Sequence, residues 1–425
     1  MAKNPDGKKI AVVGGGISGV SAAKMLSKAA SVTVYEQYSK IGGLIRCDLL
    51  EEGLYHKLGG HVFNTKSPAV AEWFWAHFDK EKEFHQLTRD ARILFGSHLM
   101  GYPLENHLYQ LPEATIKAVT GELLAKVARG REAAPANFKE ALLNIFGPTL
   151  CETYFFPYNE KIWRTDLATI PTGWLEGKLP MPDVAEILQS NILRRAETSM
   201  VHAKFYYARE NGSQFVIDRL AEGLDIRLSS PVRNLQRVTG GKWMLNGNQE
   251  ELYDSVVYTG DIRSLPGLLP EADSLSAMER IKGLRTRGIT NVFCECDPTT
   301  VSWLYLPDRH LAANRIIYTG AFSPANNQKT DRMTCVVEFV YGEDEAAIER
   351  DIKQLPGNLR RLAINHVRDA YVIQEQDTRE QIATIKSWAH EQGIYPLGRF
   401  GEWEYYNIDK AIEAGLILAN ADAFE

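Results

Sequence analysis

Three glycines near the start of the chain have the spacing of a turn that holds a dinucleotide. Gly14, Gly16 and Gly19 fit the pattern G-x-G-x-x-G. The first glycine permits a tight turn, the second lets the backbone approach a pyrophosphate, and the third lets a helix pack closely on a strand. Ile17 and Ser18 lie within the same turn and open the predicted helix, whose N-terminus offers N–H donors and the positive end of its dipole to phosphates.

Glu36 stands 20 residues after Gly16, at the end of the next predicted strand, where a carboxylate can accept hydrogen bonds from ribose hydroxyls. Residues 9–36 therefore read as strand, glycine turn, helix, strand and acid. Glycine turns between a strand and a helix also occur for packing alone. Because the strand, the helix and the acid all stand at the expected distances, we expect this unit to bind the ADP half of a dinucleotide.

A second glycine pair distinguishes between NAD and FAD, which both use this pattern. Gly42 and Gly43 begin six residues after Glu36. A Gly-Gly pair after the acid is typical of flavoproteins of the glutathione-reductase and amine-oxidase class, in which the chain then turns toward the flavin. FAD is therefore the predicted cofactor, and Gly43, Leu44 and Arg46 are candidates for contacting it.

The segment 58–66, LGGHVFNTK, combines glycines with a histidine. Gly59 and Gly60 would let the backbone come close to an isoalloxazine ring, and His61 would place an imidazole near the reactive edge of that ring. A single histidine is more often structural. The two glycines and the position of the segment after the cofactor turn favour a catalytic role for His61.

The elements that must position these residues indicate a multi-domain α/β protein. The 425 residues are enough for two or three domains, and 44% hydrophobic residues allow a sizeable core. We predict a Rossmann-like FAD-binding domain of the glutathione-reductase type, with an inserted helical domain and an antiparallel β-sheet substrate domain. The FAD-binding domain is expected in three segments, 1–69, 211–280 and 391–425, with the helical domain at 70–210 and the β-sheet domain at 281–390.

Composition excludes several classes of function. The formal net charge of −6 argues against general affinity for nucleic acid, which requires a basic surface. Five cysteines without a C-x-x-C pair indicate neither a disulfide framework nor a zinc site, and no metal is expected. The polar N-terminal residues lack the apolar core of a signal peptide, and no stretch approaches the ~20 apolar residues of a membrane span. We expect a cytoplasmic protein that acts on a small molecule. The sequence leaves open whether it forms a homo-oligomer.

Motifs spread over most of the chain carry a resemblance to a known family. They are, in order, LGGHVF with His61, YPLEN (102–106), FPYNEKIW (156–163), Trp174-Leu175 followed by Lys178, WLYLPD (303–308), Asn314-Arg315, FSPAN (322–326) and GRFGEWEYYNID (398–409). The last is the most specific, because it joins a glycine-arginine loop, spaced aromatic residues and an acid. On these motifs the chain resembles the UDP-galactopyranose mutases and their neighbours among the amine-oxidase-like and protoporphyrinogen-oxidase-like flavoproteins.

The resemblance implies an isomerase of carbohydrate biosynthesis, a nucleotide-sugar mutase that contracts pyranose to furanose rings with no net redox change. In that family, N5 of reduced FAD attacks the anomeric carbon, the nucleoside diphosphate leaves, and the flavin-bound sugar opens and recloses as a furanose. The departing diphosphate has to be held, which calls for arginine and tyrosine donors. The flavin has to be reduced, with NADPH or NADH as the expected reductant.

Carried over position by position, the resemblance implies roles for individual residues. Arg315 matches the arginine that clamps the diphosphate, and Tyr305 and Tyr405 match tyrosines on the phosphates. Arg399 matches an arginine beside the flavin, and His61 matches a histidine on the flavin face. Further candidates are, on the substrate side, Asn106, Tyr158, Trp163 and Lys178 and, on the cofactor side, Val232, Asn407 and Ile408.

The chain departs from the pattern of this family at three positions. The polar run 371–388 stands where the family has a tyrosine-proline pair, so one phosphate-binding tyrosine is expected to be missing. Lys178 stands where an arginine is common, and lysine cannot form a bidentate fork with phosphate. Asn407 stands in place of an acid near Tyr405, although Asp409 follows. These departures predict either a different grip on the diphosphate or a substrate other than UDP-galactose.

Two other functions compete with the mutase. An FAD-dependent oxidase, dehydrogenase or desaturase of the amine-oxidase class would take a hydride from a small molecule, in an apolar or carboxylate-matching cavity. A flavin or nucleotide sensor without catalysis would have little use for so many spaced aromatic and basic residues. Arg315 and Tyr405 discriminate between the first two enzymes, because only a mutase has to hold a leaving diphosphate.

Overall fold

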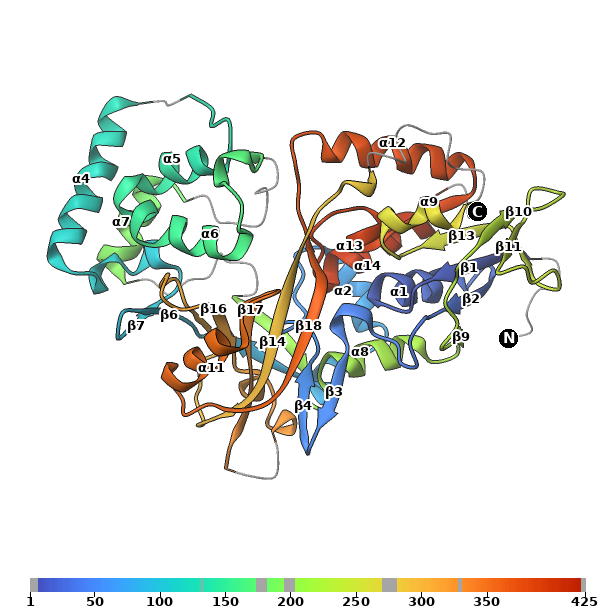
Figure 1. The fold of residues 1–425 in the computed structure, drawn as a ribbon, viewed down its shortest axis with the longest axis horizontal. Helices are drawn as coiled ribbons and strands as arrows, with labels where there is room; N and C mark the ends of the chain where they lie inside the picture. The colour runs from blue at the N-terminus through green and yellow to red at the C-terminus, as the bar shows by residue number, and fades with distance from the viewer. Residues whose placement is uncertain are drawn as a thin grey trace.

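Two β-sheets, one parallel and one mostly antiparallel, organise the chain (Figure 1). The computed structural model describes residues 7–130, 133–172, 182–194, 203–269, 281–327 and 331–421. The two sheets confirm the predicted α/β class, in which a Rossmann-like sheet accompanies an antiparallel one.

The parallel sheet contains the glycine turn. Its strands, in spatial order, are β19 (Ile394–Pro396), β13 (Ser255–Tyr258), β1 (Lys9–Val13), β2 (Ser31–Tyr35) and β9 (Asp225–Arg227). All of its pairings are parallel, and its central strands are nearly continuous apolar runs, as expected for a sheet that is covered on both faces. Helix α1 (Ile17–Leu26) connects β1 to β2, so the predicted strand-turn-helix-strand unit is confirmed.

Helices from distant parts of the chain cover the two faces of this sheet. On one face, α1 packs against α14 (Ile408–Ala419), and their side chains join Ile10 and Val12 of β1 in one apolar core. On the other face, Ala11 packs in a core that includes side chains of α12 (Thr378–Glu391). The alternation of Ile10, Ala11 and Val12 between the two cores follows from the period of two in a strand.

The second sheet has seven strands. In spatial order they are β18 (Arg360–Val372), β14 (Thr286–Cys296), β17 (Met333–Val340), β16 (Ala313–Ile317), β15 (Trp303–Tyr305), β6 (Ala91–Phe95) and β7 (His98–Gly101). The pairings of β14, β16 and β17 are antiparallel, as predicted for this region. Only the pairing of β15 with β6 is parallel.

The interval 70–210, which we expected to be mainly helical, also contributes strands. The segments β6 and β7 extend the seven-stranded sheet, and β5 (Phe84–Thr88) pairs with β8 (Lys204–Ala208). These strands are four or five residues long. Their alternation of apolar and polar residues is therefore too short to stand out from the helical patterns on either side.

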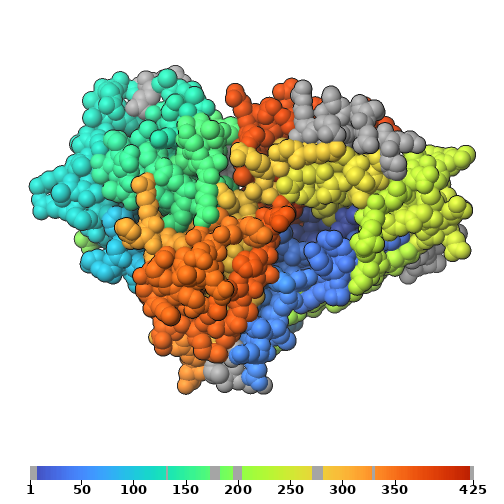
Figure 2. All heavy atoms as spheres, viewed as in Figure 1, coloured from blue at the N-terminus to red at the C-terminus, as the bar shows by residue number. Residues whose placement is uncertain are grey.

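The helices of this interval form a lobe beside the sheets, seen in teal and green in Figure 2. They are α4 (Glu113–Arg129), α5 (Phe138–Leu150), α6 (Phe156–Trp163) and α7 (Val184–Leu193), with a π-helical turn at Cys151–Phe155 between α5 and α6. The apolar core of the lobe is continuous with side chains of the large sheet, including Tyr305 and Ile317.

The remaining elements are short. The other helices are α2 (Pro68–Trp75), α3 (Lys80–Glu83), α8 (Gly212–Ala221), α9 (Leu265–Leu268), α11 (Glu345–Gln354) and α13 (Gly398–Gly401). The other strands are β3 (Cys47–Leu50) with β4 (Gly53–His56), and β10 (Leu235–Arg237) with β11 (Trp243–Leu245) and β12 (Leu252–Tyr253). All five cysteines are buried and unbridged. None of the helices in the described ranges has the length and apolar character needed to cross a membrane.

Trp403 anchors the loop that follows α13. Its side chain is fully buried, and its indole N–H donates to the carbonyl oxygen of Ile373 at 3.1 Å. The side-chain amide of Gln374 donates to the carbonyl oxygen of Trp403 in return. Helix α13, which carries Arg399, and the loop that carries Tyr405 are thereby attached to the segment after β18.

We predict that Trp403→Ala lowers the free energy of unfolding by about 3–5 kcal/mol, because it leaves a cavity and removes a buried hydrogen bond. Urea denaturation of the purified protein measures this change. Leu99→Ala is the control, since Leu99 is 58% exposed, and it should change stability by less than about 0.5 kcal/mol. Equal effects of the two substitutions would contradict the anchoring role of Trp403.

Candidate functional site

The first glycine turn has the geometry of a phosphate-binding turn. Gly14 has φ +110°, which favours glycine. A Cβ on Gly19 would lie 2.0 Å from the carbonyl oxygen of Gly14, so only glycine lets α1 start this close to β1. Gly16 differs, because its backbone is extended and a Cβ there would approach only the Cα of Gly43, at 3.8 Å. Gly16 therefore borders open space at the N-terminus of α1.

Glu36 points its carboxylate at this turn. One carboxylate oxygen accepts the backbone N–H of Gly15 at 2.7 Å, and the other accepts the N–H of Tyr38 at 2.9 Å. The side chain is buried, so the backbone fixes its orientation. Each carboxylate oxygen still has a lone pair for a further donor, as binding of ribose hydroxyls would require.

The second glycine pair lies directly against the first turn. The N–H of Gly42 donates to the carbonyl oxygen of Gly15 at 2.9 Å, and Gly16 and Gly42 form a parallel bridge. Gly43 has φ +53°, and a Cβ there would come within 3.1 Å of the Cα of Gly16. The two motifs that predicted a flavin cofactor thus form one surface.

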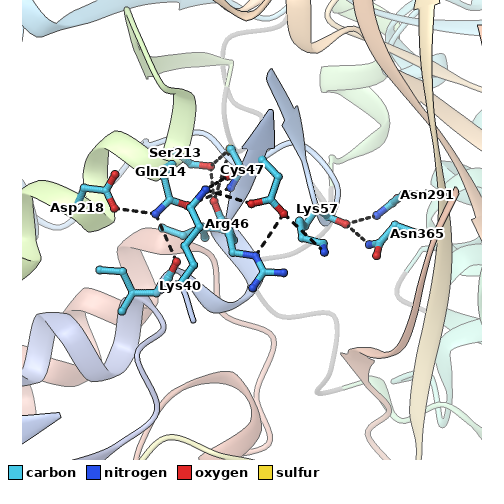
Figure 3. A network of polar contacts seen from close by, with 12 residues as sticks. Lys40, Arg46, Cys47, Lys57, Ser213, Gln214, Asp218, Asn291 and Asn365 are labelled. Atoms are coloured by element: carbon cyan, nitrogen blue, oxygen red, sulfur yellow. Dashed lines mark hydrogen bonds and ion pairs between the residues drawn. The ribbon is translucent and has the colours of Figure 1, made fainter. Parts of the chain in front are cut away.

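A polar network holds the chain that leaves this surface (Figure 3). The side-chain oxygen of Gln214 accepts the N–H of Cys47 at 3.2 Å, and its amide group donates to Ile41 and to Asp218. Ser213 accepts a weak hydrogen bond from the thiol of Cys47 and donates to Ile45 at 2.6 Å. Helix α8 therefore fixes the start of β3.

The same network joins the cofactor side to the large sheet. Asp48 pairs with Lys40 at 3.1 Å and with Arg46 and Lys57 at 3.6 Å each. The carbonyl oxygen of Lys57 accepts two hydrogen bonds, from the side-chain amides of Asn291 at 2.7 Å and Asn365 at 2.8 Å. Strands β14 and β18 thus hold the chain just before the Gly59-Gly60-His61 segment.

His61 follows a buried histidine that supports it. The N–H of His61 donates to Nδ1 of His56 at 3.4 Å, and Nε2 of His56 lies 2.6 Å from the hydroxyl of Tyr207. Because Nδ1 accepts, the proton of the neutral imidazole is on Nε2 and is donated to Tyr207. Asn326 also donates to this hydroxyl, at 2.9 Å. Burial lowers the pKa of His56 from 6.5 to about 4, so the imidazole is neutral.

Arg315 lies at the centre of the predicted substrate side. One of its terminal nitrogens donates to Glu338 at 2.8 Å and to the hydroxyl of Tyr371 at 2.9 Å. Arg315 and Glu338 are directly opposite each other on β16 and β17. The Nε atom of Arg315 is buried and has no hydrogen-bond partner in the described part of the chain. A Cβ on Gly59 would lie 3.9 Å from Arg315, so the loop before His61 borders the guanidinium.

Tyr371 connects Arg315 to the C-terminal loop. Its ring stacks on Tyr405 with the centroids 5.7 Å apart, and the guanidinium of Arg399 lies 4.8 Å from the centroid of Tyr405. Arg399 donates to the backbone carbonyl oxygens of Ala370 at 3.0 Å and Tyr406 at 3.1 Å. The structure thus brings together three of the predicted residues, Arg315, Arg399 and Tyr405.

Tyr371 was not predicted, because a phosphate-binding tyrosine was expected to be missing from the run 371–388. The structure places Tyr371 at the end of β18, with its hydroxyl on Arg315. A bulge between β14 and β18 shifts the register just before this residue. Sequence spacing does not reveal such a shift. The only signal in the sequence was that the run 371–388 begins with a tyrosine.

Tyr305 forms a second cluster on the neighbouring strand β15. Its hydroxyl accepts a hydrogen bond from Arg89 at 2.5 Å, and its ring stacks on Tyr102 at 4.6 Å. Tyr158, from helix α6, meets Tyr305 edge to face at 5.7 Å. Burial raises the pKa of Tyr158, whereas the charge of Arg315 lowers it, so the two clusters interact electrostatically. Arg89 was missed because no motif included it. Tyr102 was noted only as part of the motif YPLEN and was given no role.

The other predicted residues lie around these clusters. Trp163 ends α6 with its ring 6.5 Å from that of Tyr371, and Asn106 ends a 3₁₀ turn. Asn407 caps α14 and Ile408 opens it, while Leu44 and Val232 pack at the edges of apolar clusters. A Cβ on Gly398 would lie 2.4 Å from the hydroxyl of Ser18, so the C-terminal loop touches the first turn of α1. Lys178 lies outside the described residues.

The residues of the two glycine turns fit the ADP half of FAD. Gly16 leaves open space at a helix N-terminus, Glu36 offers fixed acceptors, and Gly42 and Gly43 close the surface without side chains. These are a phosphate cradle and a ribose acceptor in the expected relation. In the ranges that the structure covers, no group of three or more histidine, cysteine or acidic side chains is arranged to hold a metal ion.

Comparisons with known proteins agree with this geometry. A family model described as flavin containing amine oxidoreductase matches residues 17–423. Protoporphyrinogen oxidase 2, chloroplastic/mitochondrial, of Arabidopsis thaliana is 30% identical over 120 residues, which make up 28% of this chain and 22% of the plant protein. The chain therefore matches about a fifth of that relative's length.

Two solved structures share the fold across nearly the whole chain. Reduced UDP-galactopyranose mutase has a TM-score of 0.84 at 19% identity, with 97% of this chain and 93% of the other covered. A protein provisionally described as a protoporphyrinogen oxidase, from an Exiguobacterium species, has a TM-score of 0.75 at 16% identity, with 99% of both chains covered. At these identities the likeness shows the fold alone.

Two glycine substitutions should separate cofactor binding from folding. Gly16→Val adds a side chain where only Gly43 is near, so the protein should fold but retain no flavin. Gly19→Ala places a methyl group against the Gly14 carbonyl oxygen and should instead destabilise the fold, by about 1–3 kcal/mol. Flavin absorbance per protein and urea denaturation measure the two effects. A yellow, fully loaded Gly16→Val protein would contradict the assignment of the phosphate turn.

His56 should contribute a pH dependence to stability. Its pKa is lower in the folded chain than in the unfolded chain, so its contribution is fully present above about pH 6.5 and is lost as the pH falls toward about 4. We expect His56→Gln to reduce the loss of unfolding free energy between pH 7 and 4.5 by roughly 2–3 kcal/mol. His98→Gln, at the exposed start of β7, is the control and should keep the wild-type slope. The same slope in all three proteins would rule out the buried neutral imidazole.

Proposed function

The chain belongs to the flavin-containing amine oxidoreductase family, and we propose that it is a nucleotide-sugar mutase that interconverts pyranose and furanose rings. Membership in this family implies FAD. The observation that carries the proposal is the cluster of Arg315, Glu338 and Tyr371 beside the Gly59-Gly60-His61 loop.

Holding a diphosphate is the physical task that such a cluster suits. When the bond between the anomeric carbon and the diphosphate oxygen breaks, two negative phosphates must be held close enough to return. A guanidinium binds phosphate oxygens through parallel N–H bonds, and phenol hydroxyls add neutral donors. Arg315 has a buried Nε without a hydrogen-bond partner in the described residues, so it retains a donor for a substrate anion.

The neighbouring residues are assigned to supporting roles. Glu338 fixes one side of the Arg315 guanidinium and so directs the remaining N–H groups. Tyr371 and Tyr405, stacked on each other, would offer hydroxyls to the phosphates. Tyr305 would do the same from the other cluster, with Arg89 adding positive charge. His61 would face the flavin ring, held by its backbone bond to His56.

Bound in its reduced form, FAD would supply the nucleophilic nitrogen that this isomerisation needs, with NADPH or NADH as the reductant. On the substrate side, Asn106, Tyr158 and Trp163 are assigned to the nucleotide, because Tyr158 and Trp163 extend from α6 toward Tyr305 and Tyr371. This arrangement supports binding of a planar base on the lobe and of phosphates at the sheet.

The second candidate is an FAD-dependent oxidoreductase that takes a hydride from a small molecule. The matching family is described as oxidoreductases, and the aromatic cluster of Tyr102, Tyr154, Tyr158 and Tyr305 would suit contact with an aromatic or apolar substrate. Arg315 argues against this candidate, because an apolar substrate would leave its buried Nε without a hydrogen-bond partner.

An anaerobic assay distinguishes the two candidates. The flavin-loaded protein is reduced with dithionite, mixed with UDP-, GDP- and dTDP-hexoses, and the pyranose and furanose forms are separated by chromatography. A furanose that forms only with reduced flavin supports the mutase and identifies the nucleotide. If no sugar nucleotide is converted by a protein that retains FAD, the proposed reaction is wrong.

We predict that Arg315→Ala lowers mutase kcat/KM by about a thousandfold or more while FAD stays bound, since the developing phosphate charge loses its main donor. Tyr371→Phe should lower kcat/KM by about tenfold to a hundredfold, because one hydrogen bond to a charged partner is lost. Arg350→Ala is the matched control, since Arg350 lies on α11 and is more than half exposed. Unchanged turnover in Arg315→Ala would show that the diphosphate is held elsewhere.

A further inference from the structure

A cavity whose lining includes five arginines lies beside the candidate site. Its volume is about 530 Å³, within the range of roughly 300–1,000 Å³ that is typical of small-molecule sites. Most of its wall comes from three parts of the chain: the end of α6 with residues 163–165, the start of β14 with residues 284–288, and the end of β18 around residues 368–369. Arg263, Tyr341 and Ile373 complete the lining. In Figure 1, the upper ends of β14 and β18 face the helical lobe that contains α6.

Positive charge dominates the walls of this cavity. Five arginines line it, and the only acidic lining residue is Asp369. The arginines are Arg164, Arg263, Arg285, Arg287 and Arg368. Only Arg285 and Arg287 are neighbours in the chain, so no single helix face or charge run explains the convergence of the five.

Three of the five arginines are neutralised by carboxylates. Arg263 pairs with Asp261 and, at 2.7 Å, with Asp369. Arg285 pairs with Glu375 at 2.5 Å, and Arg164 pairs with Glu343. These pairs fix the three guanidinium groups in the walls.

The other two arginines have no ion pair within the described ranges. Arg287 donates to the carbonyl oxygen of Trp163, and its Nε is buried without a hydrogen-bond partner among the described residues. Burial and the nearby charges of Arg164 and Arg285 lower the pKa of Arg287, as expected for a cation that lacks a counter-charge. Arg368 is exposed and forms no ion pair within the described ranges, although its charge helps to lower the pKa of its neighbour Asp369.

We propose that this cavity is a phosphate-binding subsite in which Arg287 and Arg368 hold a phosphoryl group of a small molecule. Arg287 lacks a counter-charge in the described residues, and Arg368 has only Asp369 nearby, which already pairs with Arg263, so positive charge is left for a phosphoryl group. Guanidinium groups favour this ligand because their parallel N–H bonds fit the tetrahedral oxygens. Arg164 and Arg285 are already held by carboxylates, so they contribute to the positive electrostatic potential of the cavity and do not contact the ligand directly.

The position of the cavity allows two sources for the phosphoryl group. Arg287 is opposite Tyr371 in the ladder between β14 and β18, and Trp163 lies between the cavity and the ring of Tyr371. The group could therefore belong to the same nucleotide that Arg315 is proposed to hold, or to a separate phosphorylated molecule. The inference rests on the charges of the cavity and not on the proposed reaction.

The test uses inorganic pyrophosphate as the probe, titrated calorimetrically into the flavin-loaded, oxidised protein at low ionic strength. Arg287→Gln and Arg368→Gln should each weaken pyrophosphate binding about tenfold, and the double variant should abolish it. Arg233→Gln is the control. It removes an exposed arginine that does not line the cavity, so it should leave pyrophosphate binding unchanged. Arg368→Gln alone keeps the test decisive if Arg287→Gln disturbs the end of α6.

The proposal is overturned if the wild-type protein does not bind pyrophosphate. It is also overturned if binding persists in the double variant and is lost only in Arg315→Ala. Repeating the titration with saturating UDP, GDP or dTDP separates the two sources. If the nucleotide competes with pyrophosphate and also binds more weakly to the double variant, the phosphoryl group belongs to the nucleotide. Undiminished pyrophosphate binding assigns it to a separate molecule, and failure of all three nucleotides to bind contradicts the mutase without affecting this subsite.

Discussion

A guanidinium that is withdrawn from water needs a counter-charge and acceptors, and Arg315 obtains both from Glu338 and Tyr371. The cost of removing only one partner of such a pair is about 3–5 kcal/mol, because the other charge stays buried without compensation. The pair stands directly opposite on the neighbouring strands β16 and β17, and Tyr371 brings the end of β18 into contact with it. The loop at Gly59 runs past the same guanidinium, and φ +54° at this residue favours glycine.

The cofactor side depends on a different constraint, the close approach of backbones. Gly14, Gly19 and the Gly42-Gly43 pair all stand where a Cβ would meet another part of the chain, whereas Gly16 borders open space. The two sides are joined at Lys57, whose carbonyl oxygen is held by Asn291 and Asn365 of the large sheet. The path from the glycine turns to His61 is thus anchored at the sheet that carries Arg315.

The sequence predicted the cofactor side well because its motifs are local. The spacing of Gly14, Gly16, Gly19 and Glu36 sits within one strand-helix-strand unit, so adjacent residues alone determine the turn. The substrate side is built from residues far apart in the chain, and Glu338 and Arg89 became visible only through strand pairing. The role of Tyr371 depends on a bulge, and β6 and β7 were too short for their alternation to be recognised within a helical interval. The predicted domain boundaries remain a prediction.

The packing of α14 on α1 has a consequence for biosynthesis. The strand β1 pairs with β13, more than two hundred residues later, and the sheet is completed by β19 and covered by α14. A chain that emerges from the ribosome starting at its N-terminus therefore displays the glycine turn long before its neighbouring strand and covering helix exist. The helices of the lobe are contiguous in the chain, but their apolar core is also completed later, by Tyr305 and Ile317 of the large sheet. Loading of the flavin is thus expected to follow release of the nascent chain, and the half-built sheet is the stage that most needs protection by chaperones.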